Sequence, residues 1–146
     1  MPKREPTDTN RRIEQLLTER ILVLDGAMGT MVHALQLTEQ DFRGRQFADH
    51  PCDLKNFIDV LSITQPEAIE KIHRQYLEAG ADIIATNTFS ATTIGLHDFL
   101  FAGEPARGRK DQQFFQRVVD DPDLRALVQE MNVAAAKIAR RAAERV

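Results

Sequence analysis

Two short apolar runs, each followed by a stretch rich in glycine or hydroxyl residues, are the feature that most constrains the fold of this chain. The first run is 21–24 (ILVL), and the second lies within 81–86 (ADIIAT). Neither run alternates between apolar and polar residues. Uninterrupted apolar runs of this length are typical of parallel strands covered by helices on both faces. We therefore expect two buried parallel strands.

The segment between the two runs predicts the helix that a parallel connection requires. Thr64 and Glu67 have the spacing of a capping box, and Pro66 falls in the first turn. Gly80 is placed to end this helix. Four apolar residues with helical spacing are expected to form its buried face: Ile69, Ile72, Tyr76 and Leu77. Strand, helix and strand in this order predict a right-handed βαβ unit.

The rest of the chain predicts further helices but no third strand. Helical spacing is found in 10–19 and 28–37, and again after Phe89 to about residue 101. The strongest helical periodicity is in 123–146. Two parallel strands leave both outer edges unpaired and do not make an independently stable sheet, so the chain looks unfinished.

We divide the chain into a tail with a lead-in helix over 1–20 and one α/β unit over 21–146. The segment near 99–123, which includes glycine, proline and many charged residues, is expected to be a surface insertion.

Polar residues directly follow both predicted strands and form the candidate binding site. Because the carboxyl ends of parallel strands share one edge of a sheet, the two clusters are expected to converge there. Their glycines, carboxylate, hydroxyls and amide suit a small zwitterion such as an amino acid. The alternative is a purely structural role, in which the glycines form a tight turn and the Thr and Asn side chains cap the next helix. The candidate residues are Asp25, Gly26, Ala27, Met28, Gly29, Thr30, Thr86, Asn87 and Thr88.

Other ligands fit the sequence less well. The dinucleotide fingerprint lacks one of its three glycines, and no Gly-Lys-Ser/Thr follows to make a phosphate loop. With 19 basic and 22 acidic residues, the net charge of -3 argues against a nucleic-acid partner. Cys52 is the only cysteine, and the four histidines do not pair at metal-ligand spacing, so no metal site is expected. No stretch has the length of a signal peptide core or a membrane span, which predicts a cytoplasmic protein.

Three segments taken in order carry a resemblance to a known family. They are LDGAMGTM, FADHPCDLKN and LSITQPEAIEKIHRQYLEAGADIIATNTFSATT, and the resemblance resumes in MNVAAAKIARRAAERV. Together they resemble the N-terminal homocysteine-binding module of cobalamin-dependent methionine synthases. The resemblance implies the first two βα units of a (β/α)8 TIM barrel, with the candidate residues holding the polar groups of homocysteine. Ala85 stands where relatives usually have glutamate.

The resemblance also implies the chemistry of the parent enzyme. There, zinc held by three cysteines binds the homocysteine sulfur, which accepts a methyl group from methylcobalamin. Those cysteines belong to later strands, so we expect a fragment that is inactive alone, binds neither zinc nor cobalamin, and needs the remaining domains of its parent as partners. Two alternatives stay open: a small interaction protein built on a partial barrel, and a fragment of a cobalamin-independent homocysteine methyltransferase that uses betaine or a sulfonium donor.

Overall fold

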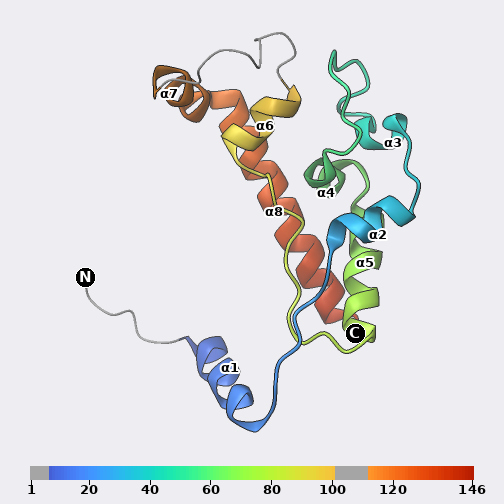
Figure 1. Cartoon of the computed structure of the whole chain (residues 1–146), viewed down its shortest axis with the longest axis vertical. Helices are drawn as coiled ribbons and strands as arrows, with labels where there is room; N and C mark the ends of the chain where they lie inside the picture. The colour runs from blue at the N-terminus through green and yellow to red at the C-terminus, as the bar shows by residue number, and fades with distance from the viewer. Residues whose placement is uncertain (1–6, 101–111) are drawn as a thin grey trace.

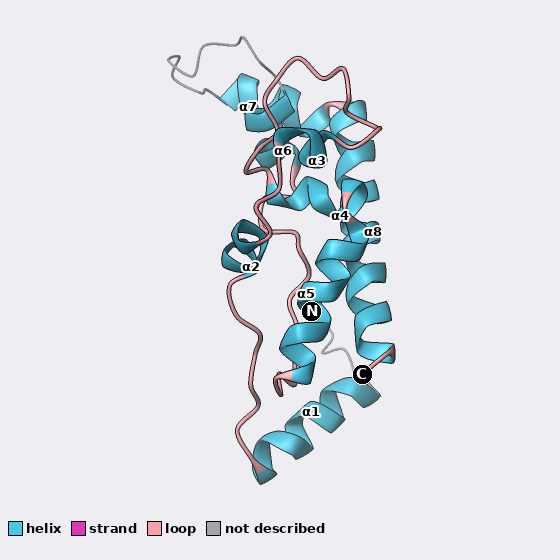
Figure 2. Cartoon of the chain, turned by 90° about the vertical axis from the view of Figure 1, so that its right-hand side faces the viewer, coloured by secondary structure: helices cyan, strands magenta, loops and turns pink. Residues whose placement is uncertain are grey.

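The computed structural model describes residues 7–100 and 112–146, and helices dominate this part of the chain (Figures 1 and 2). In chain order the helical elements are α1 (Asp8–Glu19), α2 (Met28–Ala34), α3 (Glu39–Arg43), the 3-10 turn η1 (Ile58–Val60), α4 (Leu61–Thr64), α5 (Pro66–Glu78), α6 (Thr93–Leu100), α7 (Gln112–Asp120) and α8 (Pro122–Glu144).

The predicted α/β fold, with two βα units of a barrel, is wrong for the described residues. The two apolar runs meet at a single isolated parallel bridge, between Leu24 and Ile83. Only three backbone hydrogen bonds hold them together, two to the Val23 carbonyl and one from the Asp25 N–H to the Ile83 carbonyl at 2.9 Å. Figure 1 shows these two segments running side by side without strand arrows.

The reason for this error is that the two runs are not covered by other elements. Ile21, Val23 and Leu24 are 86%, 52% and 60% exposed, where the sequence analysis expected burial on both faces. An apolar run indicates that a segment needs cover, but it does not say which element supplies that cover. With no further strand beside them among the described residues, one bridge does not extend into a ladder.

The two longest helices, α5 and α8, pack side by side, run in the same direction and contain much of the core (Figures 1 and 2). We refer to them as the helix pair. From α5, Ile69 and Ile72 are buried, and from α8, Met131 and Ile138. The periodicity that predicted the last helix and its buried face is thus confirmed. At the carboxyl end of α8 the buried Glu70 carboxylate of α5 pairs with Arg145, and with Arg141 at 3.1 Å.

The boundaries of α5 follow partly from the predicted signals. Pro66 occupies the first turn. Gly80 adopts φ 103° and its N–H bonds the Leu77 carbonyl at 2.9 Å, while the Ala81 N–H bonds the Tyr76 carbonyl at 3.0 Å. This pair of bonds is the glycine-dependent Schellman ending. The predicted capping box is wrong, because Thr64 ends α4 and its hydroxyl donates to the Val60 carbonyl at 3.3 Å.

Three short α-helices were not predicted, namely α3, α4 and α7. α3 begins at a capping box in which Thr38 and Asp41 bond each other's backbone N–H groups. α7 falls within the predicted insertion near 99–123, of which residues 101–111 lie outside the described part of the chain. In the described residues, no helix combines the length and apolar character that crossing a membrane requires.

Candidate functional site

Asp25 links the two predicted polar clusters. Its carboxylate Oδ2 accepts a hydrogen bond from the Ala85 N–H at 3.0 Å, next to Thr86. The side chain is half-buried, so part of the carboxylate still faces solvent. The structure therefore brings the end of the first apolar run against the end of the second.

The glycine turn after Asp25 lies against α5. A Cβ atom on Gly26 would stand 3.2 Å from the Tyr76 hydroxyl, and this hydroxyl donates to the Ala27 carbonyl at 3.4 Å. Gly26 thus lets the turn approach the phenol ring closely. Met28, Gly29 and Thr30 form the first turn of α2. Met28 packs against the core, whereas Thr30 is exposed.

The second cluster divides into a surface pair and a buried anchor. The hydroxyls of Thr86 and Thr88 bond each other at 2.8 Å. Asn87, 5% exposed, donates from Nδ2 to the Ile58 carbonyl at 2.9 Å and to the Ser62 hydroxyl at 3.1 Å. Asn87 therefore fixes the loop to η1 and α4, while the threonines remain the groups available for a ligand.

The sequence reasoning missed two buried ionisable residues beside this site. Asp59, at the centre of η1, accepts a hydrogen bond from the Ser90 N–H at 3.0 Å. Burial raises the pKa of the Asp59 carboxyl, and backbone N–H groups oppose that change.

His73 on α5 is fully buried, and neither ring nitrogen has a partner among the described residues. Burial lowers the pKa of its imidazole, while the negative charge of Asp25 acts in the opposite direction. Its position in the buried face of a helix was the only sequence signal available, and that signal does not separate a packed histidine from a functional one.

The described His, Cys, Asp and Glu residues do not make up a ligand set for zinc. In residues 7–100 and 112–146, no three His, Cys, Asp or Glu side chains are grouped so that they could hold a metal ion. Cys52 is half-buried, and its N–H donates to Nδ1 of His50 at 3.2 Å. That local contact accounts for their proximity.

A comparison with known families identifies the class of protein to which this site belongs. The family model described as Homocysteine S-methyltransferase matches residues 22–146, and this match includes both polar clusters. The chain belongs to the homocysteine S-methyltransferase family. Since the match covers most of the chain, it supports the resemblance at the level of the family and its substrate class.

Proposed function

We propose that this chain binds the amino-acid part of homocysteine with Asp25 and the Thr86–Thr88 pair, in an enzyme that methylates the homocysteine sulfur. The observation that carries the proposal is the hydrogen bond between Asp25 and the backbone of Ala85, because it brings a carboxylate and two hydroxyls to one exposed place. Membership of the homocysteine S-methyltransferase family supplies the substrate class.

The charges and hydrogen-bonding groups of this place are complementary to an amino acid. One carboxylate oxygen of Asp25 is used by Ala85, which leaves the other for the substrate ammonium group. Within the threonine pair one hydroxyl proton is shared, so the second O–H remains to donate to the substrate carboxylate.

The reaction itself is a transfer to sulfur. The homocysteine thiol loses its proton, the sulfur lone pair forms the new S–CH₃ bond, and the bond between methyl group and donor breaks with its electrons remaining on the donor. We further propose methylcobalamin as the donor and a cobalamin-dependent methionine synthase as the parent, whose remaining domains are the partners of this chain. The resemblance of FADHPCDLKN supports this branch of the family over the branches that use betaine or a sulfonium.

Calorimetric titration with homocysteine tests the binding role of Asp25. Asp25→Asn keeps an oxygen for the Ala85 N–H but removes the charge, and we expect it to weaken homocysteine binding about tenfold. Asp8→Asn, in exposed α1, makes the same charge change away from the site and is expected to have no effect.

A second ligand identifies which group of homocysteine Asp25 recognises. 4-Mercaptobutyrate lacks the ammonium group, so it should bind wild type and Asp25→Asn equally weakly. Equal homocysteine affinities for wild type and Asp25→Asn would show that Asp25 does not bind the ammonium group.

Turnover and zinc content test the rest of the proposal. The chain alone is expected to form no methionine from homocysteine with methylcobalamin, betaine or a sulfonium donor, and to purify without stoichiometric zinc. Methionine formed with betaine or a sulfonium donor would overturn the choice of cobalamin. Tight, stoichiometric zinc would overturn the expectation that the chain alone is inactive.

One observation favours the interaction protein as a second candidate. Phe89, close to the candidate site, is 100% exposed, and Ile21 is 86% exposed. Exposed apolar residues near an open backbone edge are typical of surfaces that bind another chain. Saturable binding of a partner protein that Phe89→Ser abolishes, without any affinity for homocysteine, would favour this candidate over the first.

A further inference from the structure

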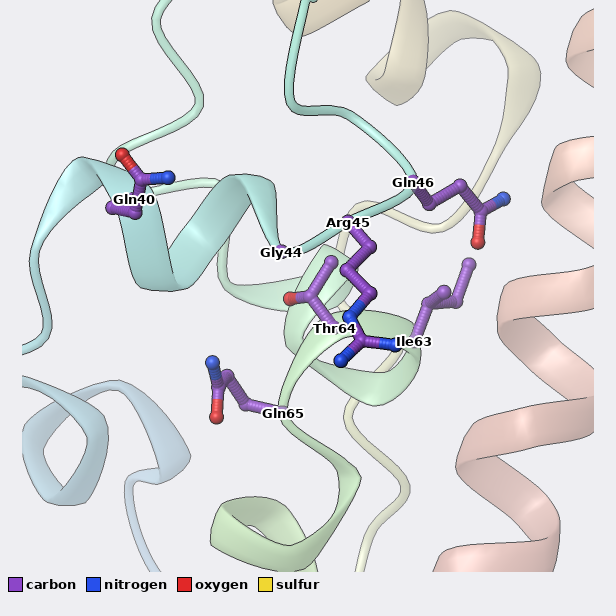
Figure 3. Close-up of a pocket in the computed structure, with 7 residues that line it drawn as sticks. All are labelled: Gln40, Gly44, Arg45, Gln46, Ile63, Thr64 and Gln65. Carbon is purple, nitrogen blue, oxygen red and sulfur yellow. The ribbon is translucent and has the colours of Figure 1, made fainter.

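A polar surface pocket lies between the end of α3 and the junction of α4 with α5, away from the residues assigned to homocysteine (Figure 3). Its volume of about 530 Å³ is within the range of small-molecule sites. Its lining residues are Gln40, Gly44, Arg45, Gln46, Ile63, Thr64 and Gln65.

Arg45 is the charged group of this pocket. Figure 3 shows its side chain running from the segment after α3 to the α4 turn, with the guanidinium group over Thr64 and Ile63. In the described part of the chain no carboxylate pairs with Arg45, unlike Arg43 two residues earlier, which pairs with Glu39 at 2.6 Å. A planar guanidinium without a partner is suited to bidentate binding of an anion.

The backbone that carries Arg45 is held in place by close packing. Gly44 adopts φ 54°, and a Cβ atom there would come within 3.0 Å of Cβ and Cγ2 of Thr64. The chain after α3 therefore lies directly on the α4 turn. This packing fixes the backbone from which the Arg45 side chain extends.

The neutral side chains add hydrogen-bond acceptors beside the guanidinium. Gln65 donates from Nε2 to the Asp41 carbonyl at 3.2 Å, which orients its amide and leaves Oε1 as an acceptor. The Thr64 hydroxyl uses its proton on the Val60 carbonyl and therefore offers lone pairs. A ligand that matches these groups carries an anion for Arg45 and an N–H for either Thr64 or Gln65.

The local charge favours an anion with one negative charge over a phosphate with two. Arg45 alone carries charge among the described residues that line the pocket. Gln46, at the rim, donates from Nε2 to the Glu130 carboxylate of α8 at 3.3 Å, which places an acidic group nearby. One guanidinium beside that acidic group leaves a doubly charged ligand incompletely neutralised.

We propose that the Arg45 pocket binds small N-acylamino acids, with the ligand carboxylate on the guanidinium and its amide N–H on Thr64 or Gln65. This site is separate from the proposed homocysteine site. They share α4, which faces Asn87 through Ser62 and the Arg45 pocket through Thr64. Because Asp25 takes no part in the Arg45 pocket, Asp25→Asn separates the failure of one proposal from the failure of the other.

The test is a titration of the whole chain followed by backbone amide NMR. N-acetylglycine is expected to shift the Gly44, Arg45 and Gln65 amides in a saturable manner, whereas the neutral N-acetylglycinamide at the same concentrations does not. Inorganic phosphate is expected to bind at least about tenfold more weakly than N-acetylglycine, which corresponds to about 1.4 kcal/mol.

Two variants and a control attribute this binding to the pocket. Arg45→Gln is expected to weaken N-acetylglycine binding about tenfold. Gln40→Glu, in the exposed first turn of α3, adds a negative charge to the lining of the pocket at a position that favours acidic residues, so it is expected to weaken binding while α3 stays folded. Arg140→Gln, an exposed site on α8, makes the same charge change and is expected to leave the affinity unchanged.

Three results would overturn the proposal. The first is an absence of shifts at these amides, and the second is an Arg45→Gln affinity equal to that of wild type. The third is tighter binding of phosphate than of N-acetylglycine, which would assign the pocket to phosphorylated ligands.

Discussion

The helix pair of α5 and α8 and the extended pair formed by residues 20–25 and 81–85 use similar apolar residues with opposite results. Ile72 in the helix pair is 1% exposed, while Ile21 in the extended pair is 86% exposed. A helix satisfies its own backbone hydrogen bonds and needs cover on one face only. An extended segment needs neighbours for its backbone as well as for both of its faces. The helix pair is therefore the stable part of the described chain, and the extended pair depends on a few polar contacts.

Shortening a buried side chain in the helix pair of α5 and α8 should produce the largest loss of stability. Ile72→Ala removes a buried side chain and leaves a cavity, so we expect it to lower the free energy of unfolding by about 2 to 5 kcal/mol. Ile21→Ala, in the extended pair, is expected to change it by less than about 0.5 kcal/mol. Urea unfolding followed by circular dichroism measures both values. Similar losses of unfolding free energy in Ile72→Ala and Ile21→Ala would show that the two regions do not differ in their contribution to stability.

A smaller effect on stability, which depends on pH, is expected from the buried His73 of α5. Burial lowers the pKa of His73 in the folded state, below an unfolded value of about 6.5. Its neutral form therefore adds stability fully above about pH 6.5, and this stability is lost as the pH falls further through the folded pKa. His73→Leu should flatten the decline in stability between about pH 7 and pH 5.

The matched control for this experiment is His33→Leu on α2, which leaves His73 in place and so should retain the decline. Midpoints of urea unfolding, measured for wild type and both variants across this pH range, test whether His73 causes the decline. Parallel curves for wild type and His73→Leu would show that His73 does not cause the dependence on pH.

The smallest effect on stability is expected from the hydrogen bonds that join Arg20, Val23 and Asp82 at the start of the extended pair. We call this group the clasp. The Asp82 carboxylate accepts hydrogen bonds from the Arg20 guanidinium at 2.7 Å and from the Val23 N–H at 2.9 Å. These bonds lower the pKa of Asp82 to about 2. The contribution of the clasp is thus present above an unfolded pKa of about 3.9 and is lost as the pH falls toward 2.

Amide NMR of Val23 follows this clasp directly. The Val23 N–H resonance should titrate with a midpoint near 2 in wild type. Asp82→Asn should remove that titration while leaving the resonances of the helix pair unchanged. If the pH midpoint of the Val23 N–H resonance were near about 3.9, the pKa of an unfolded aspartate, the hydrogen bonds of the clasp would not be stabilising the Asp82 carboxylate.

The sequence allowed the helices to be predicted far better than the sheet. Pro66 and Gly80 limit α5 through their own backbone chemistry, and the periodicity of α8 reflects one buried face. Both signals are local. Whether residues 21–24 become a strand depends on neighbours that the run itself does not encode, and that prediction was wrong.

The candidate site was predicted in part. That Asp25 and Thr86 lie close together followed from expecting both apolar runs to end at one edge, and the single bridge between Leu24 and Ile83 is enough to produce this proximity. Asn87 was expected to be free for a ligand, but it is committed to η1 and α4, because its amide partners Ile58 and Ser62 are 29 and 25 residues away in the sequence. The Arg45 pocket was not predicted from the sequence, because its residues come from two separate segments that share no motif.

The hydrogen bond between Val23 and Asp82 also has a consequence for the order of folding. It joins groups that are 59 residues apart, with all of α5 between them. Closing so long a loop has an entropic cost, whereas a helix forms from contacts within a few residues and on a far shorter timescale. We therefore expect the region where we propose that homocysteine binds to be among the last to form as the chain folds, after α5 has shortened the distance that this loop must close.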